Sequence, residues 1–234
     1  MAKYKDSTIM EMLKKAMEIK NEIMKNLSSY HVSISNGNSK IGKVMNVSTM
    51  PILACGNCKE CKNYCYDVKA CVRFVDNVLF NRMKNFLIAK YNREKFFAEI
   101  RNKLARRKKN FYFRWHVAGD ILDYEYFLEM VAIAKEFPHF KFWTYTKMYF
   151  IVNRYIAENG SIPKNLVVMF SEWDGVQLDN PFNNPTFSVK MANGNKNHSV
   201  EYFNNIFKCP GNCDFCKTHH CGCVAGMNVY ADEH

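Results

Sequence analysis

The spacing of apolar residues predicts an amphipathic helix near the beginning of the chain. Between residues 4 and 28, polar positions such as Lys14 and Glu18 separate apolar side chains that recur at close to helical intervals. These apolar residues are Ile9, Leu13, Met17, Ile23, Met24 and Leu27. We expect this helix to dock on the core. Residues 30–35 then alternate as in a short strand, and residues 36–42 have the turn chemistry that ends it.

From residue 111 onward, short apolar stretches alternate with helical periodicity. The pattern predicts strands at 111–118, 140–146 and 165–171, with helices at 123–137 and 149–157. One or two further helices are expected over 73–108. Parallel strands covered on both faces are apolar without interruption and need right-handed helical crossovers. The expected fold is therefore α/β, with an open or partial parallel (βα) barrel. Residues 172–198 predict long loops around one weak strand.

Length and composition favour one unit over residues 1–234. The chain has 234 residues, 48% of them apolar, which is enough for one sizeable core. No uninterrupted apolar stretch reaches the roughly 20 residues of a membrane-spanning helix, and we find no export signal, so a cytoplasmic protein is expected. The formal charge of +11 favours anionic partners such as phosphorylated metabolites, nucleic acid or an acidic protein. A simple excess of solvated lysines explains it equally well. The oligomeric state stays open.

All ten cysteines fall into two short groups. They are Cys55, Cys58, Cys61, Cys65 and Cys71 in the first, and Cys209, Cys213, Cys216, Cys221 and Cys223 in the second. The first group reads C-x2-C-x2-C-x3-C, the spacing of bacterial ferredoxins, with Tyr66 in place of their proline. The second opens C-x3-C-x2-C, the pattern of radical-SAM enzymes, although those enzymes carry it near their first strand.

Metal binding is the expected role of these groups. A disulfide scaffold suits much shorter, exported chains. Either a [4Fe–4S] cluster, one or two of them, or zinc would satisfy the cysteines. Zinc is the main alternative because Cys58 and Cys61 with Cys213 and Cys216 would supply two C-x2-C pairs to one tetrahedral ion. A neighbouring histidine, His219 or His220, could also reach a metal.

Residues 37–43 imitate a phosphate-binding loop, because they fit G-x4-G-K after a predicted strand. We reject a nucleotide-triphosphate site, since Val44 replaces the hydroxyl residue that binds magnesium and the following residues do not begin a helix. Lys40 and Lys43 remain candidates for binding some other anion. A plain surface turn is the alternative.

Polar residues gather where two predicted strands end. Asp120 follows the strand at 111–118, and Tyr145 and Lys147 end the strand at 140–146. Arg114 and His116 are expected on one face of the first strand, because side chains repeat every second residue. Together the five would form a catalytic or anion-binding set at the mouth of a barrel. Alternatively, His116 is a core histidine and Asp120 initiates the next helix.

The chain resembles the bacteriophage "gene product 88" domain family. The resemblance covers Gly37 to Lys40 with Gly42 and Lys43, Cys61, Cys65 and Tyr66, Arg114 to Asp120, Tyr145 to Lys147, and the closing cysteines with His234. It implies a virus-encoded protein with a radical-SAM-like barrel and a cysteine-bound metal. Cys58, Cys71 and Cys223 are extra to that pattern. The expected metal ligands are therefore Cys55, Cys61, Cys65, Cys209, Cys213, Cys216 and Cys221.

Three functions compete at this point. The first is an iron–sulfur enzyme that hydrolyses a small phosphorylated or ester substrate, with His116, Asp120 and Lys147 at its site. The second is a radical-SAM-like or other redox enzyme. The third is a zinc-stapled module that binds nucleic acid through the basic residues between Arg101 and Lys109.

Overall fold

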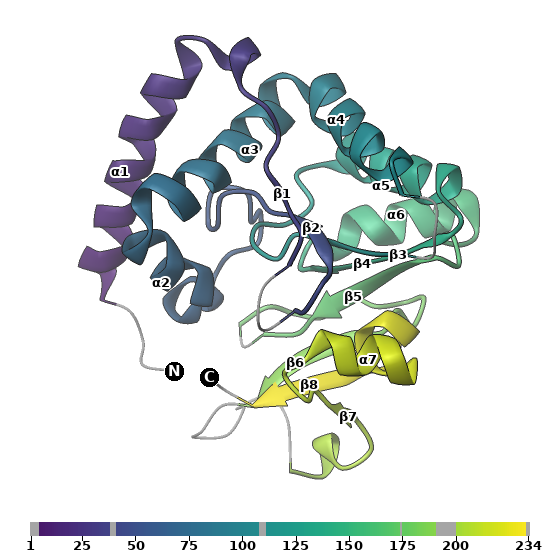
Figure 1. The fold of residues 1–234 in the computed structure, drawn as a ribbon. Helices are drawn as coiled ribbons and strands as arrows, with labels where there is room; N and C mark the ends of the chain where they lie inside the picture. Colours follow the sequence, from purple (N-terminus) through teal and green to yellow (C-terminus); the bar gives the residue numbers. More distant parts are fainter. Residues whose placement is uncertain (1–4, 38–40, 108–110, 174, 191–199, 233–234) are drawn as a thin grey trace.

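A mixed α/β architecture is built on one eight-stranded sheet (Figure 1). The computed structural model describes residues 5–37, 41–107, 111–173, 175–190 and 200–232. The strands are β1 (Ile34–Ser35), β2 (Met45–Val47), β3 (Phe111–Trp115), β4 (Phe140–Thr146), β5 (Leu166–Ser171), β6 (Thr186–Lys190), β7 (Phe207–Lys208) and β8 (Val229–Asp232). Their order is β1-β2-β3-β4-β5-β6-β8-β7, and only the β1–β2 pair is antiparallel. The sheet is open, with β1 and β7 as its edges among the described strands.

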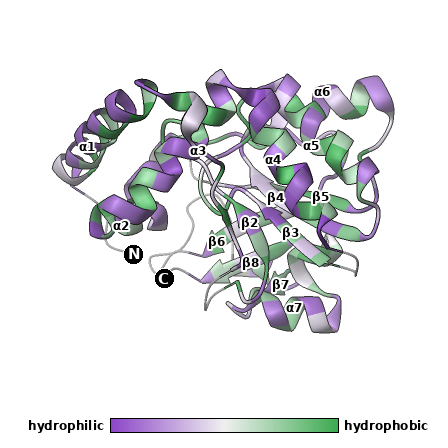
Figure 2. Cartoon of the chain, turned by 45° about the horizontal axis from the view of Figure 1, so that its top comes forward, coloured by the Kyte–Doolittle hydropathy of each residue, from purple (hydrophilic) through white to green (hydrophobic). Residues whose placement is uncertain are grey.

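Three helices cover one face of the sheet: α4 (Arg93–Ala105), α5 (Tyr124–Glu136) and α6 (Tyr149–Asn159). Phe113 and Trp115 of β3 and Phe142 of β4 face these helices and are fully buried with their apolar side chains. The β-α alternation is thus confirmed, because each strand presents every second residue to a crossover helix. Figure 2 shows α4 to α6 on one side of β3 to β5 and α7 on the other.

The N-terminal part forms a second apolar cluster beside the sheet. It contains α1 (Asp6–Met24), α2 (Tyr66–Arg73), a π-helical turn at Val75–Leu79 and α3 (Phe80–Tyr91), with short 3-10 turns at Leu27–Ser29 and Glu60–Tyr64. The expected amphipathic helix is confirmed as α1, which buries Ile9, Met12 and Ala16. Met17 and Met24, expected on its apolar face, are instead 43% and 40% exposed.

The C-terminal residues cover the face of the sheet opposite α4 to α6. Here α7 (Cys213–His219) and the 3-10 turn η5 (Gly222–Ala225) pack on Trp143 of β4 and Val167 of β5. Strand β6 continues this half of the sheet, and the last described residues add β8, so the chain end completes the same sheet (Figure 1). The second cysteine group therefore lies against the sheet itself.

The expected strand at 30–35 is reduced to Ile34–Ser35. The backbone N–H of Val32 donates to Glu99 at 2.7 Å, and that of Ser33 donates to Asn85 at 2.8 Å. Because side chains satisfy these groups, the segment joins no sheet ladder there. The weak strand expected between 172 and 198 is β6. None of the described helices has the length and apolar character needed to cross a membrane.

Two thiol clusters and two half-buried cations at the candidate site

The first thiol cluster gathers Cys55, Cys58, Cys61 and Cys65 on the turns between β2 and α2. The Sγ atoms of Cys58 and Cys61 lie 3.7 Å apart, and Cys55 hydrogen-bonds to Cys58 from the other side. Cys65 is the N-cap residue immediately before α2. The hydrogen bond with Cys55, together with burial, raises the pKa of Cys58 to about 12, and burial raises that of Cys65 to about 11. These groups are therefore neutral thiols until a metal displaces their protons.

Lys147 lies beside this first cluster, just past the end of β4. Its Nζ donates to Ser171 Oγ at 3.3 Å, and its charge interacts with Cys61, Asp120, Cys55 and Cys58. Burial alone lowers the pKa of Lys147, but the electrostatic interactions with Cys61, Asp120, Cys55 and Cys58 outweigh it and raise the pKa above the usual value. The ammonium group is thus charged at the point where the thiols meet.

Asp120 fixes the position of Lys147 rather than initiating a helix. Its carboxylate accepts the backbone N–H groups of Ile121 at 2.7 Å and of Lys147 at 2.9 Å. Burial raises the pKa of Asp120, and these donors oppose the shift. Gly119 before it has φ of 86° and packs against Thr49, where no side chain fits. The residue that initiates α5 is Asp123, whose Oδ1 accepts the N–H of Tyr126 at 2.9 Å.

The second thiol cluster lies on the sheet face that α7 covers. Cys209 follows β7, Cys213 and Cys216 belong to α7, and Cys221 and Cys223 belong to the turn after it. Cys216 hydrogen-bonds to Cys221 and interacts electrostatically with Cys223 and Cys209. Burial raises the pKa of both Cys216 and Cys223 to about 12. All five thiols of the sequence group therefore meet in one place.

Arg114 and Tyr145 of neighbouring strands form the sheet side of this second cluster. The Tyr145 hydroxyl donates to Cys223 Sγ at 2.9 Å, and the Arg114 guanidinium lies over the Tyr145 ring, 4.7 Å from its centroid. The Nε of Arg114 is buried without a hydrogen-bond partner. Its main electrostatic partners are the phenols of Tyr145 and Tyr66 and the thiols of Cys213 and Cys223. Within the described part of the chain, no carboxylate forms an ion pair with Arg114.

His116 lies on the opposite side of the sheet from Arg114, so the expectation that they share a face is wrong. The backbone of His116 has φ of 52°, which ends the strand at Trp115 and breaks its alternation. The ring contacts Thr144 Oγ1 at 3.1 Å through Nδ1 and the Tyr126 hydroxyl at 3.0 Å through Nε2. Burial lowers the pKa of His116 to about 3, so the ring is neutral.

The five polar residues expected at one mouth are therefore divided among three places. Asp120 and Lys147 adjoin the first cluster, Arg114 and Tyr145 adjoin the second, and His116 lies in the helix-covered core. Strand ends do bring Lys147 to Ser171, a partner that sequence reasoning missed. The sequence could have indicated this contact, because the adjacent parallel strands β4 and β5 both end at the same edge of the sheet.

The cysteines extra to the family pattern behave differently from one another. Cys58 and Cys223 lie inside the two clusters, whereas Cys71 is fully buried among apolar side chains and contacts Asp67 at 3.8 Å. Neither candidate histidine turns to the thiols. His219 bonds the carbonyl of Phe215 at 2.9 Å, and His220 is exposed.

The anion-binding expectation for the loop at 37–43 is only partly described. Lys40 lies outside the described residues. Lys43 is exposed, and its carbonyl accepts a hydrogen bond from Lys217 Nζ at 3.4 Å. The chain continues into β2 instead of a helix, which agrees with our rejection of a phosphate loop.

The spacing of the thiols bears on which kind of metal centre they could hold. Among the described residues, no three cysteine, histidine or carboxylate side chains are grouped so that they could hold a metal ion as they stand. However, the 3.7 Å between the Sγ atoms of Cys58 and Cys61 matches the edge of about 3.8 Å in a tetrahedron with metal–sulfur bonds of about 2.3 Å. A cubane cluster, with a separate iron for each thiolate, would require these two sulfurs to move apart.

Comparison with known proteins gives one match, to the family described as Gene product 88, over residues 12–177. The matched stretch includes the first thiol cluster and the strands that carry Arg114, Tyr145 and Lys147, and it ends before the second cysteine group. No curated protein and no solved structure matches the chain. Since the match spans well over half of the sequence, this protein belongs to the Gene product 88 family.

Proposed function

We propose that this protein is a cytoplasmic, virus-encoded iron–sulfur enzyme that hydrolyses a small phosphorylated or ester substrate. Its two thiol clusters would hold two separate metal centres, at least one of them a [4Fe–4S] cluster. The observation that carries this proposal is the pairing of each cluster with a cation that has no carboxylate ion pair among the described residues: Lys147 beside the first and Arg114 beside the second.

Charge balance supports metal-bound thiolates in both places. A centre held by three or four thiolates is an anion, and an enclosed cation next to it offsets the energy of burying that charge. Arg114 lacks a carboxylate partner in the described structure, and its nearest acidic groups are phenols and thiols. A guanidinium so placed is stable when the thiols are deprotonated by a metal.

The first centre is the better candidate for substrate chemistry. Lys147 and Ser171 lie at the carboxyl ends of parallel strands, where α/β folds bind ligands. The ammonium of Lys147 binds the anionic group, and Asp120 orients Lys147 through its backbone N–H. A metal held by Cys55, Cys58 and Cys61 would supply a Lewis acid at this edge. Because both ring nitrogens of His116 are satisfied in the core, we assign His116 a structural role.

The second centre has the features of a closed site. Cys209, Cys213 and Cys216 show radical-SAM spacing, but Cys221 and Cys223 stand in the same cluster and can complete a four-thiolate set. Glu172, which could have served the methionine end of SAM, accepts hydrogen bonds from Ser188 and Tyr202 instead. Radical chemistry, with a sheet curved into a radical-SAM-like barrel, is accordingly our runner-up.

Zinc at the first centre is the second candidate, favoured by the 3.7 Å spacing of Cys58 and Cys61. Anaerobic purification with analysis of iron, acid-labile sulfide and zinc separates the alternatives. The wild-type chain should be brown, and Cys58→Ala/Cys61→Ala and Cys213→Ala/Cys216→Ala should each lose one centre and keep the other. Colourless protein with stoichiometric zinc and no sulfide would overturn the iron–sulfur assignment. Loss of all metal in either variant would overturn the separation into two centres.

A further inference from the structure

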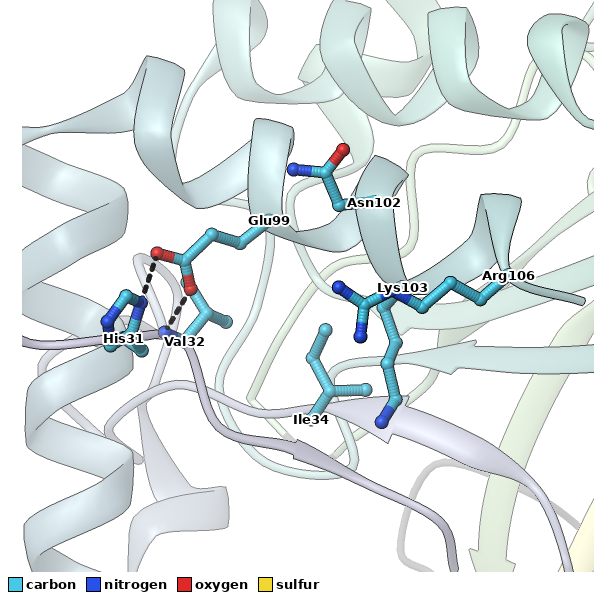
Figure 3. A pocket seen from close by; sticks show the side chains of 7 residues that line it. All are labelled: His31, Val32, Ile34, Glu99, Asn102, Lys103 and Arg106. Carbon is cyan, nitrogen blue, oxygen red and sulfur yellow. Dashed lines mark hydrogen bonds and ion pairs between the residues drawn. The ribbon is translucent and has the colours of Figure 1, made fainter.

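A groove far along the chain from both cysteine groups runs between residues 31–34 and one face of α4. Its volume is about 490 Å³. Glu99, Asn102, Lys103 and Arg106 line it from the helix, and His31, Val32 and Ile34 line it from the segment that leads into β1 (Figure 3). The helical residues stand at positions i, i+3, i+4 and i+7, so they share one face. The volume falls within the range of about 300–1,000 Å³ typical of small-ligand sites.

One end of the groove is electrostatically satisfied. The Glu99 carboxylate contacts His31 Nδ1 at 2.9 Å through Oε1 and accepts the backbone N–H of Val32 at 2.7 Å through Oε2. Lys95 Nζ lies 3.8 Å from the same carboxylate. Figure 3 shows His31 and Glu99 joined across this end. The charge of Glu99 is therefore already compensated. This end of the groove offers polar groups to a ligand and is not a site for a cation.

The other end carries two cations that have no side-chain partner in the described part of the chain. Across the described residues, neither Lys103 nor Arg106 forms a hydrogen bond or an ion pair through its side chain, and Figure 3 shows both extending over the groove. Arg101, in the same basic run, differs because it pairs with Glu129 and Glu136, both at 2.8 Å. The carbonyl end of α4 offsets about half a charge at most. This end of the groove therefore keeps a net positive charge.

The floor of the groove is apolar. Val32 and Ile34 are half-buried; Val32 lies beside His31 and Glu99, and Ile34 lies between that end and the cations (Figure 3). A complementary ligand thus has an anionic group, a flat apolar body and a hydrogen-bonding edge. Inorganic anions lack the apolar body and the hydrogen-bonding edge, and lipid chains lack the hydrogen-bonding edge.

We propose that this groove binds a nucleotide unit. The phosphate lies between Arg106 and Lys103, whose donors suit phosphate oxygens. The base packs on Val32 and Ile34, with its edge towards Asn102 and His31. The unit can be a free mononucleotide or one residue of a single strand, since both present the same phosphate, sugar and base. This site is independent of the metal centres.

Fluorescence anisotropy with the purified full chain tests the proposal. The probe is a fluorescein-labelled dodecathymidylate, and the competitors are AMP and inorganic phosphate. Lys103→Gln/Arg106→Gln should weaken probe binding by about 10-fold or more and reduce the slope of log affinity against log salt by about 0.7, the value for one phosphate contact on a single strand. The control Lys5→Gln/Lys14→Gln removes the same charge from exposed positions on or next to α1 and should change binding less than about 2-fold.

The competitors distinguish the two sources of the nucleotide. If AMP displaces the probe at micromolar levels, the ligand is a free nucleotide. If the probe binds and AMP does not displace it, the ligand is a single strand. Either result supports the site, provided that the Lys103→Gln/Arg106→Gln variant loses the binding. Equal weakening in both double variants would show a non-specific charge effect and overturn the proposal. Inorganic phosphate competing as well as AMP, or no probe binding at all, would also overturn it. Unchanged metal content and circular dichroism in each variant exclude misfolding as the cause.

Discussion

The hydroxyl of Tyr145 donates a hydrogen bond to Sγ of Cys223 at 2.9 Å, which links a central strand of the sheet to a thiol 78 residues further along the chain. Arg114 stacks on the same ring, so one aromatic side chain connects a half-buried cation to the second cluster. Such outer contacts orient metal ligands and tune the charge they carry.

Replacing Tyr145 with Phe should weaken metal binding at the second centre by about 10- to 100-fold, because Cys223 loses its hydrogen-bond donor while the ring stays in place. Chelator competition, followed by the release of iron or zinc, measures the effect. Tyr112→Phe is the matched control, since the Tyr112 hydroxyl lies in the same layer but donates to the carbonyl of Lys217 at 3.4 Å. Release from Tyr145→Phe at the wild-type rate would contradict the role we give to this bond.

His116→Asn should reduce stability by about 1–3 kcal/mol and leave turnover per folded molecule unchanged, because the hydroxyls of Thr144 and Tyr126 lose a partner. Asparagine is chosen because it tolerates the positive φ of 52°. Denaturant unfolding, together with turnover of a phosphoester, separates the effects. Normal stability with lost turnover would restore His116 to the catalytic set.

The stability of the protein should depend on pH through the same histidine. Burial lowers the pKa of folded His116 to about 3, whereas in the unfolded chain it is about 6.5. Between these values the unfolded state binds the extra proton, so stability is present above about pH 6.5 and falls as the pH decreases, by up to about 1.4 kcal/mol per pH unit. Between pH 7 and pH 4, the free energy of unfolding should therefore depend less on pH for His116→Asn than for the wild type.

Much of the fold follows from the sequence, and the arrangement of the site follows less well. Strands β3, β4 and β5 were predictable because uninterrupted apolar runs such as Leu166–Phe170 suit only buried parallel strands. The face of His116 was not, since a single left-handed residue reverses the alternation on which the prediction rests. Strands β2, β7 and β8 have four residues or fewer, too few to show periodicity.

Lys147→Met should abolish turnover of anionic substrates, by about 100-fold or more, and loosen metal at the first centre, because Cys61 loses its nearest cation. Lys147→Arg should retain part of the turnover and part of the metal affinity at the first centre. Lys141→Met is the control on the same strand, where Nζ donates to the carbonyl of Lys164 at 3.0 Å, away from the thiols. Turnover and metal retention equal to the wild type in Lys147→Met would refute the proposed anion site.

Deleting residues 209–234 should prevent stable folding even when the first centre is loaded. The deletion removes β8, which pairs with β6, and exposes Trp143, which is fully buried in the intact chain. Near-ultraviolet circular dichroism and dye binding to exposed apolar surface report the loss. A full-length chain with serine at all five cysteines of the second group separates packing from metal. A truncated chain with native dichroism would show that the N-terminal part is self-sufficient.

The cover that α7 and its neighbours place on the sheet has a consequence for biosynthesis. A ribosome delivers the first cysteine group roughly 150 residues before the second, on the order of 10 s at ordinary translation rates. Once they are made, Trp143 and Val167 lack the cover of α7 and η5 until the second group is delivered, so the nascent chain presents an apolar surface to chaperones. On the proposed arrangement of two metal centres, the order of synthesis would let the first centre fill before the cysteines of the second exist.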